Sequence, residues 1–296
     1  MPLASPLAQR LFAWAQYPLP HHALSRLVGV ATRSRRPWIR KPLIHWFVRR
    51  YGVELGEAAQ PDPDAYPDFQ AFFTRALRPE ARPLCDRADG IACPADGTLS
   101  QLGRLDGGRI LQAKGRHFDA DELLGGSAAR AAPFRDGPFA TVYLAPRDYH
   151  RVHMPVTGTL REMVHVPGRV FSVNPATTAH VPRLFARNER VVAIFDTAAG
   201  PMAVVLVGAM LVATVATRWA GTVTPPRGRR VRRWEYPASG EGSVSLARGE
   251  ELGAFNLGST VIVLFGREQA QWAPGLTPGE SLAMGQCLGQ LAPPSA

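Results

Sequence analysis

The sequence predicts an α+β fold in which short N-terminal helices precede a β-rich core. The chain has 296 residues, of which 46% are hydrophobic and 20% are charged, and this balance is typical of a globular protein. Its 27 prolines and 28 glycines favour turns and short strands over long helices. From about residue 90, valine-rich runs alternate with glycine-containing turns, which indicates a sheet-based core.

Residues 1–58 form the first of two predicted parts. Tryptophans and other apolar residues alternate there with arginines, and prolines divide the segment into short helices: Pro18, Pro20, Pro37 and Pro42. Apolar faces with tryptophan beside arginine fit helices that lie in a membrane interface. The alternative is that these helices pack on the protein core, because amphipathicity alone says only that one face is buried.

Residues 59–296 form the second part, the β-rich catalytic core. A Pro/Asp-rich link over 60–64 leads to a predicted helix over 68–76. Several apolar runs then predict strands: 110–113, 139–144, 191–195, 203–207 and 261–265. The run 202–216 is shorter than the roughly 20 residues needed to span a bilayer, and its valines predict two buried strands.

The chain is strongly basic, with 34 Lys and Arg against 24 Asp and Glu, a net charge of +10. Such a charge favours partners that carry phosphate, either nucleic acid or an anionic membrane, although biased composition explains it equally well. Arginines at 227, 229, 230, 232 and 233 lie beside Trp234 and Tyr236. This cluster could bind single-stranded nucleic acid, contact lipid headgroups, or form a solvated loop.

Neither the cysteines nor the N-terminus indicates export. Cys85, Cys93 and Cys287 are scattered without a C-x-x-C pair, so we expect neither a zinc site nor a disulfide framework, and a reducing compartment by default. Prolines and Arg10 interrupt the first 20 residues, which therefore lack the apolar stretch of a signal peptide.

The most informative chemical feature is the bond between Gly258 and Ser259, where a polar turn enters the apolar run 261–265. Glycine has no side chain to shield its carbonyl and tolerates strained backbone angles. The next hydroxyl can therefore attack that carbonyl, provided that a base takes its proton. Such a bond could break itself and leave a modified serine at a new chain end.

Two further segments supply the partners that such a serine needs. His150 and His153 follow the predicted strand 139–144, and histidine is the side chain best matched to proton transfer near neutral pH. Asp96 lies in the turn Pro94-Ala95-Asp96-Gly97. Asp96, His153 and Ser259 together have the residue types of a catalytic triad, while the segment Phe171-Ser172-Val173-Asn174 could line a pocket.

Each of these features has a plainer interpretation. A Gly-Ser or Asp-Gly pair is often only a turn, and a single histidine is usually structural. A zinc site at the two histidines is disfavoured because no carboxylate or cysteine stands at ligand spacing. The triad could also belong to a serine hydrolase, but no G-x-S-x-G elbow is present and Ser259 precedes a strand.

At these residues the sequence resembles the bacterial phosphatidylserine decarboxylases, which are pyruvoyl-dependent and membrane-associated. The resembling segments run in the family's order from about residue 65 to 270, and they are Ala95–Gly97, Leu111–Gly115, Arg147–Pro155, Phe171–Asn174, Leu184–Arg190, Trp219–Pro226 and Leu257–Thr260. The N-terminal helices match only in character, and the arginine cluster is richer in arginine than the family pattern.

The resemblance implies a role for each candidate residue. Ser259 becomes a pyruvoyl group when the chain cuts itself between 258 and 259; Asp96 and His153 complete the triad that drives this cut; His150 serves decarboxylation; and Asp148 supports the histidine segment. The pyruvoyl group would supply the electron sink that loss of carbon dioxide requires, a task that other enzymes give to pyridoxal phosphate. No metal is implied.

The resemblance also implies partners and a location. We expect phosphatidylserine in a bilayer as substrate, an anionic membrane surface, pairing of the large and small chains of one precursor, a homo-oligomer, and no nucleic acid. The location would be peripheral, on the cytoplasmic side of the cell membrane. The competing predictions are the serine hydrolase, whose chain stays whole, and a basic nucleic-acid-binding protein, which leaves the Gly-Ser junction unexplained.

Overall fold

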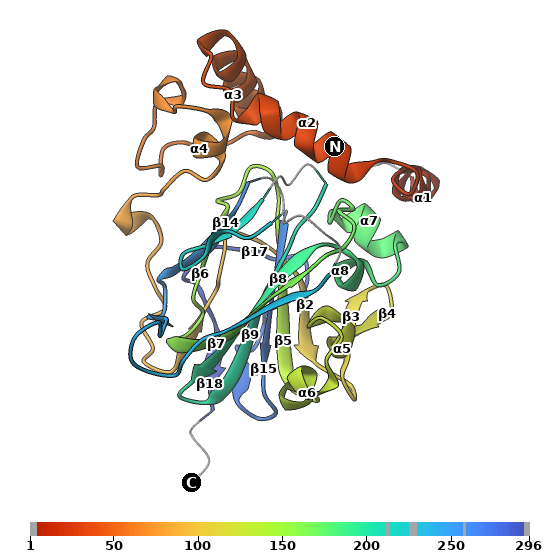
Figure 1. The fold of residues 1–296 in the computed structure, drawn as a ribbon, viewed down its shortest axis with the longest axis vertical. Helices are drawn as coiled ribbons and strands as arrows, with labels where there is room; N and C mark the ends of the chain where they lie inside the picture. The colour runs from red at the N-terminus through yellow and green to blue at the C-terminus, as the bar shows by residue number, and fades with distance from the viewer. Residues whose placement is uncertain (1–4, 211–213, 225–229, 257–258, 293–296) are drawn as a thin grey trace.

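The computed structural model describes residues 5–210, 214–224, 230–256 and 259–292, and it confirms the α+β class. Three N-terminal helices cross one end of a body built mainly from antiparallel strands (Figure 1). The helices are α1 (Pro6–Ala15), α2 (His21–Thr32), α3 (Pro37–Tyr51), α4 (Phe69–Phe73), α5 (Ala120–Leu123), α6 (Ala128–Ala131), α7 (Pro175–His180) and α8 (Leu184–Arg187), with 3-10 turns at Pro63–Ala65, Pro79–Ala81 and Ala132–Phe134.

The largest sheet runs in the order β12-β7-β8-β9-β15-β5-β2-β17, with β13 also paired to β7. Its strands are β2 (Gly97–Arg104), β5 (Pro138–Leu144), β7 (Gly158–Val166), β8 (Arg190–Thr197), β9 (Gly200–Val207), β12 (Arg232–Glu235), β13 (Ser245–Leu246), β15 (Ser259–Phe265) and β17 (Ser281–Leu282). The predicted strands 139–144, 191–195, 203–207 and 261–265 are all confirmed within it.

Three smaller sheets complete the body: β1-β18-β16, β11-β10-β14-β6 and β3-β4. Their strands are β1 (Gly90–Ala92), β3 (Arg109–Ala113), β4 (Arg116–Asp119), β6 (Arg151–His153), β10 (Val215–Thr217), β11 (Gly221–Thr222), β14 (Glu251–Phe255), β16 (Ala270–Trp272) and β18 (Cys287–Leu291). The run 202–216 does contribute two strands, β9 and β10. Within the described ranges, no helix is both long and apolar enough to cross a bilayer.

Strand β15 lies at the centre of the large sheet, between β9 and β5, and all seven of its residues are buried. Successive side chains of a strand point to opposite faces. Val261, Val263 and Phe265 accordingly enter one apolar core, whereas Ile262 and Leu264 enter a second core on the other face. This burial on both faces explains why 261–265 is continuously apolar instead of alternating.

The N-terminal helices differ from the prediction at one proline. Pro18 and Pro20 do separate α1 from α2, and Pro37 begins α3, but α3 runs through Pro42. An internal proline costs one hydrogen bond and creates a clash. Here the loss is offset because Ile44 and Phe47 of α3 pack into an aromatic core with α4.

Helix α4 is shorter than the predicted helix over 68–76. Asp68 caps its start by accepting the Ala71 N–H at 2.8 Å. It ends at Phe73 because the chain beyond it pairs with the segment before it: Ala58 and Leu77 form a bridge, and the Ala59 N–H donates to the Ala76 carbonyl. Phe69, Phe72 and Phe73 are buried as a structural cluster.

Two further expectations change. The structure corrects the expectation of no disulfide, because Cys85 and Cys287 are bonded, and Cys93 is free and buried. Their 202-residue separation gives no sequence signal, since contacts between distant segments, among them the pairing of β1 with β18, bring them together. In the arginine cluster, 227 and 229 lie outside the described residues, while Arg232 and Arg233 belong to the exposed strand β12 rather than to a loop.

Candidate active site

Ser259 is the first residue of β15 and pairs with Leu144, the last residue of β5. Its side chain is fully buried, and its Oγ has no hydrogen-bond partner among the described residues; the next hydroxyl, of Thr260, is in the same state. A buried hydroxyl without a partner costs about 1–3 kcal/mol. Leu257 and Gly258, the other half of the predicted cleavage junction, lie outside the described residues.

The histidine segment follows β5 directly, as the sequence predicts. The turn after Leu144 is closed by Asp148, whose Oδ2 accepts the Ala145 N–H at 2.7 Å, so Asp148 does support this segment. The Phe255 N–H then donates to the His150 carbonyl at 3.0 Å. His150 therefore lies beside Phe255, the last residue of β14. Phe255 precedes Ser259 by four positions in the chain.

The His150 ring is fully buried and tilts against Phe73, with 4.1 Å between ring centroids. Its Nδ1–H donates to the Asp148 carbonyl at 2.8 Å, which leaves Nε2 as a lone pair without a partner in the described chain. Burial lowers the pKa of His150 to about 3. The ring is thus a neutral base at any physiological pH.

His153 is held from both sides. Its Nδ1–H donates to the Gly249 carbonyl at 2.8 Å, and its Nε2 accepts from the Tyr149 hydroxyl at 3.0 Å. Burial lowers the pKa of His153, although the Gly249 carbonyl and the negative charges of Glu251 and Asp96 oppose this. Burial also raises the pKa of Tyr149 to about 12, so its hydroxyl keeps the proton that it donates.

Asp96 precedes β2 and binds an arginine instead of a histidine. Its two oxygens accept from Arg82 Nε at 2.8 Å and Nη2 at 2.6 Å, and Oδ1 also accepts the Met284 N–H at 2.8 Å. These contacts raise the pKa of Arg82. The structure records no hydrogen bond between Asp96 and His153, so the three predicted triad residues are not linked in this conformation.

Arg75 is a further buried cation that the sequence reasoning missed. Its side chain is 4% exposed, lies over the Phe72 ring and donates from Nη2 to the Arg147 carbonyl at 3.2 Å. Burial lowers its pKa, partly offset by Tyr66 and Asp96. No sequence signal separates it from the many other arginines; only its place after three phenylalanines hints at burial.

An apolar pocket lies between the N-terminal helices and the sheet. Val28 of α2 and Trp46 of α3 line one side, and Tyr143 of β5 lines the other. Ser172, Val173 and Asn174 line it as well, as predicted, whereas Phe171 of the same segment is buried in the core and is not among the lining residues. Tyr143 pairs across the sheet with Thr260, the neighbour of Ser259, but Ser259 itself is not among the described residues that line the pocket. In the described residues no group of His, Cys, Asp or Glu could hold a metal.

Comparison with known proteins decides the family. A family model described as phosphatidylserine decarboxylase matches residues 69–290, and a second, described as PSD, matches residues 11–52. The chain belongs to the phosphatidylserine decarboxylase family. Membership confirms the resemblance, the enzyme class and the predicted decarboxylation of phosphatidylserine, and it does not support the hydrolase or nucleic-acid alternatives.

Curated relatives cover almost the whole chain. One from Ectopseudomonas mendocina (strain ymp) is 59% identical over 283 residues, covering 96% of this chain and 99% of the relative. Others from Pseudomonas putida (strain GB-1) and Pseudomonas aeruginosa (strain LESB58) are each 57% identical, covering 96% and 94% of this chain and 99% and 96% of the relatives. All three are named phosphatidylserine decarboxylase proenzyme, which agrees with the predicted precursor.

Proposed function

We propose that this decarboxylase makes its own pyruvoyl group from Ser259 by cutting the chain between residues 258 and 259. The observation that carries the proposal is the fully buried Ser259 Oγ, which has no hydrogen-bond partner among the described residues. Its position at the first residue of a central strand adds support, because β5 and β9 would keep the new end in place after the cut.

In the proposed cut, a base takes the Ser259 hydroxyl proton, and Oγ attacks the Gly258 carbonyl. The acyl group moves from nitrogen to oxygen, and elimination of the resulting ester leaves residues 1–258 with an ordinary carboxylate. The dehydroalanine left on the small chain takes up water and releases ammonia, so that a ketone ends the chain. Such a ketone, next to an amide carbonyl, supplies the electron sink for loss of carbon dioxide from an amino acid.

We assign the cut to His153 with Asp96 and the later proton return to His150. Both histidines are neutral, as a base must be, and the charge of Asp96 favours a proton on His153. In turnover, His150 would return a proton to the α-carbon after carbon dioxide leaves. This step fits a fully buried ring on a residue that contacts Phe255, four positions before Ser259 in the chain.

One observation favours a second assignment, in which His150 takes the Ser259 proton as well. Its Nε2 is unpartnered among the described residues, whereas His153 Nε2 is occupied by Tyr149. His150→Ala and His153→Ala separate the two. If His153 drives the cut, only His153→Ala stays whole on a reducing, denaturing gel, and His150→Ala is cut but makes no product. If His150→Ala also stays whole, the second assignment holds.

We propose that the enzyme is a peripheral protein on the cytoplasmic side of the cell membrane, docked through α1–α3. Several large apolar side chains on these helices face solvent: Leu7, Leu11, Trp14, Leu27, Val30, Trp38 and Trp46. Arginines lie beside two of the tryptophans, with Arg10 over Trp14 and Arg36 over Trp38. Exposed apolar groups next to cations fit the boundary between acyl chains and anionic headgroups.

We propose that the apolar pocket receives part of an acyl chain at this surface, since helix residues line one side and Tyr143, the cross-strand partner of Thr260, lines the other. Vesicles that contain phosphatidylserine provide the test. We expect the protein to convert it to phosphatidylethanolamine and Ser259→Ala to make none, while Ser281→Ala, which changes an exposed serine of the same small chain, keeps full activity. Product formation by Ser259→Ala would refute the proposed cofactor.

A further inference from the structure

The bond between Cys85 and Cys287 spans the proposed cut. Cys85 lies before β1, Cys287 is the first residue of β18, and their Cα atoms are 4.9 Å apart. Position 258 falls between them, so a cut there assigns Cys85 to the large chain and Cys287 to the small one. The chain has three cysteines, and Cys93 is free, so no second disulfide could join the two products.

We propose that the disulfide between Cys85 and Cys287, whenever the pair is oxidised, covalently joins the large and small chains of the mature enzyme. The proposal rests on the proposed cut between 258 and 259. It makes this cysteine pair an oxidative modification site, and it predicts that the mature protein remains one covalent unit in oxidising conditions and becomes two chains in reducing conditions.

Backbone contacts hold the two cysteines together without the sulfur bond. The Cys85 N–H donates to the Gly285 carbonyl at 2.8 Å, and the Gly285 N–H donates to the Cys93 carbonyl at 2.9 Å. Strands β1 and β18 then pair, with Ala92 opposite Cys287. Since a disulfide needs Cα atoms about 4.4–6.8 Å apart, the fold brings the thiols to bonding distance in advance.

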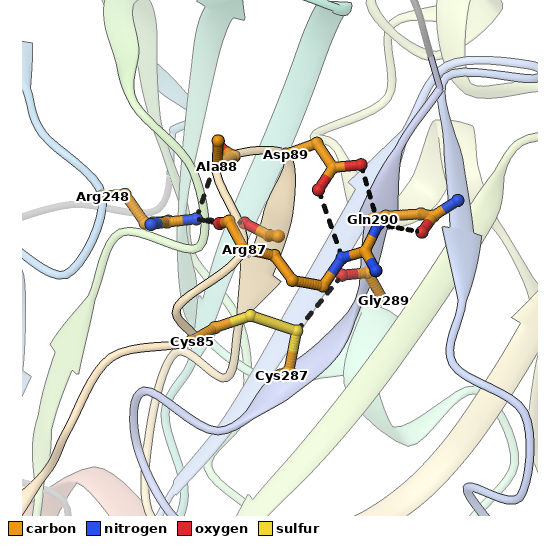
Figure 2. The surroundings of a disulfide bond; sticks show 9 residues. Cys85, Arg87, Ala88, Asp89, Arg248, Cys287, Gly289 and Gln290 are labelled. Atoms are coloured by element: carbon orange, nitrogen blue, oxygen red, sulfur yellow. Dashed lines mark hydrogen bonds and ion pairs between the residues drawn. A yellow bond between two sulfur atoms is a disulfide. The ribbon is translucent and has the colours of Figure 1, made fainter.

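Side chains also cross between the two proposed chains at this site. Arg87 pairs with Asp89 of its own segment and donates to Gln290 of β18 at 2.6 Å (Figure 2). Gly90 leaves room for sulfur, because a Cβ at that position would come within 2.4 Å of the Cys85 Sγ. A larger residue at 90 would therefore displace the sulfur from its present position.

The formation of the disulfide balances in electrons and protons as follows. Two thiols lose two electrons and two protons, and a small disulfide such as oxidised glutathione accepts them and becomes two thiols. Cys287 is the more exposed partner, so its thiolate attacks the small disulfide first, and Cys85 then displaces the glutathione thiolate. Cys93 does not compete, because burial raises its thiol pKa to about 12.

The test uses the mature protein equilibrated with oxidised glutathione, then denatured and treated with N-ethylmaleimide. Without reductant, we expect one species with the summed mass of both chains and a single labelled thiol, and with reductant two chains. Cys287→Ser should give two chains in both conditions. Cys93→Ser should give the same chains as the unmodified sequence, with no labelled thiol before reduction and two after it. Two separate chains without reductant, with three labelled thiols, would overturn the proposal.

Uncut Ser259→Ala protein distinguishes this proposal from the proposed cut. It should label one thiol after oxidation and three after reduction, even though its backbone is continuous. If the original sequence also runs as one chain in reductant, the cut has failed, and the thiol count still decides whether the disulfide forms.

Discussion

Because the His150 ring is buried, we predict that acid lowers the free energy of unfolding by a measurable amount. Its pKa is about 3 in the folded protein and about 6.5 in an unfolded chain. Between these pH values the unfolded state binds a proton at His150 and the folded state does not. The free energy of unfolding therefore falls as the pH drops from about 6.5 to about 3. The full loss is about 5 kcal/mol, at about 1.4 kcal/mol for each pH unit.

This loss is already measurable in mild acid. At pH 5 the same relation gives about 2 kcal/mol relative to pH 8, because the unfolded histidine is almost fully protonated there. The assay is urea unfolding at both pH values in the Ser259→Ala background, so that a single uncut chain is compared. The matched variant is His150→Phe, which keeps a ring against Phe73 and removes the titrating group.

We expect the difference between pH 8 and pH 5 to be about 2 kcal/mol smaller in His150→Phe than in its parent. Other titrating groups, His153 among them, are present in both proteins and cancel in the comparison. Equal pH dependence in the two proteins would refute the burial argument, since it would mean that His150 binds its proton as readily in the folded state as in the unfolded state.

Three further predictions concern the ion pair between Arg82 and Asp96, the role of Ser259, and the N-terminal helices. Arg82→Ala should lower the free energy of unfolding by about 3–5 kcal/mol, because it leaves the Asp96 carboxylate buried and without its cation. As a control, Arg109→Ala removes an exposed ion pair and should cost under about 1 kcal/mol in the same urea assay. Equal losses in the two variants would contradict this reasoning. Ser259→Ala should run as one chain on a reducing gel, and normal processing would exclude Ser259 as the attacking residue. Trp14→Ser with Trp38→Ser should weaken binding to anionic vesicles roughly tenfold, or by about 1.4 kcal/mol, whereas Leu84→Ser, at an exposed leucine outside α1–α3, should not. Unchanged binding by the double variant would exclude α1–α3 as the docking surface.

Much of the site's framework could be predicted because it follows from local pattern. The apolar run 261–265 predicts a strand buried on both faces, and Ser259 begins that strand. Strand 139–144 likewise predicts that the histidine segment follows a strand end, as it does in β5. These signals depend on neighbouring residues alone.

Contacts between distant segments could not be predicted in the same way. Nothing in the sequence indicates that Asp96 would bind Arg82. The chain is rich in arginine, and the tertiary fold alone decides which arginine lies next to a given carboxylate. Cys85 and Cys287 meet through the pairing of β1 with β18 and the hydrogen bond from Cys85 to Gly285. The passage of α3 through Pro42 depends on aromatic packing against α4, which proline's local preference does not reveal.

The most direct test of the account is the intact mass of the small chain, measured after reduction of purified, active protein. We predict a chain that begins at position 259 and is lighter by one ammonia than a hydrolytic fragment that starts with serine. Because a ketone replaces its amine, this chain should also yield no residue to stepwise degradation from its amino end. Active protein whose backbone is unbroken at that position, or a small chain that begins with an ordinary serine, would contradict the account.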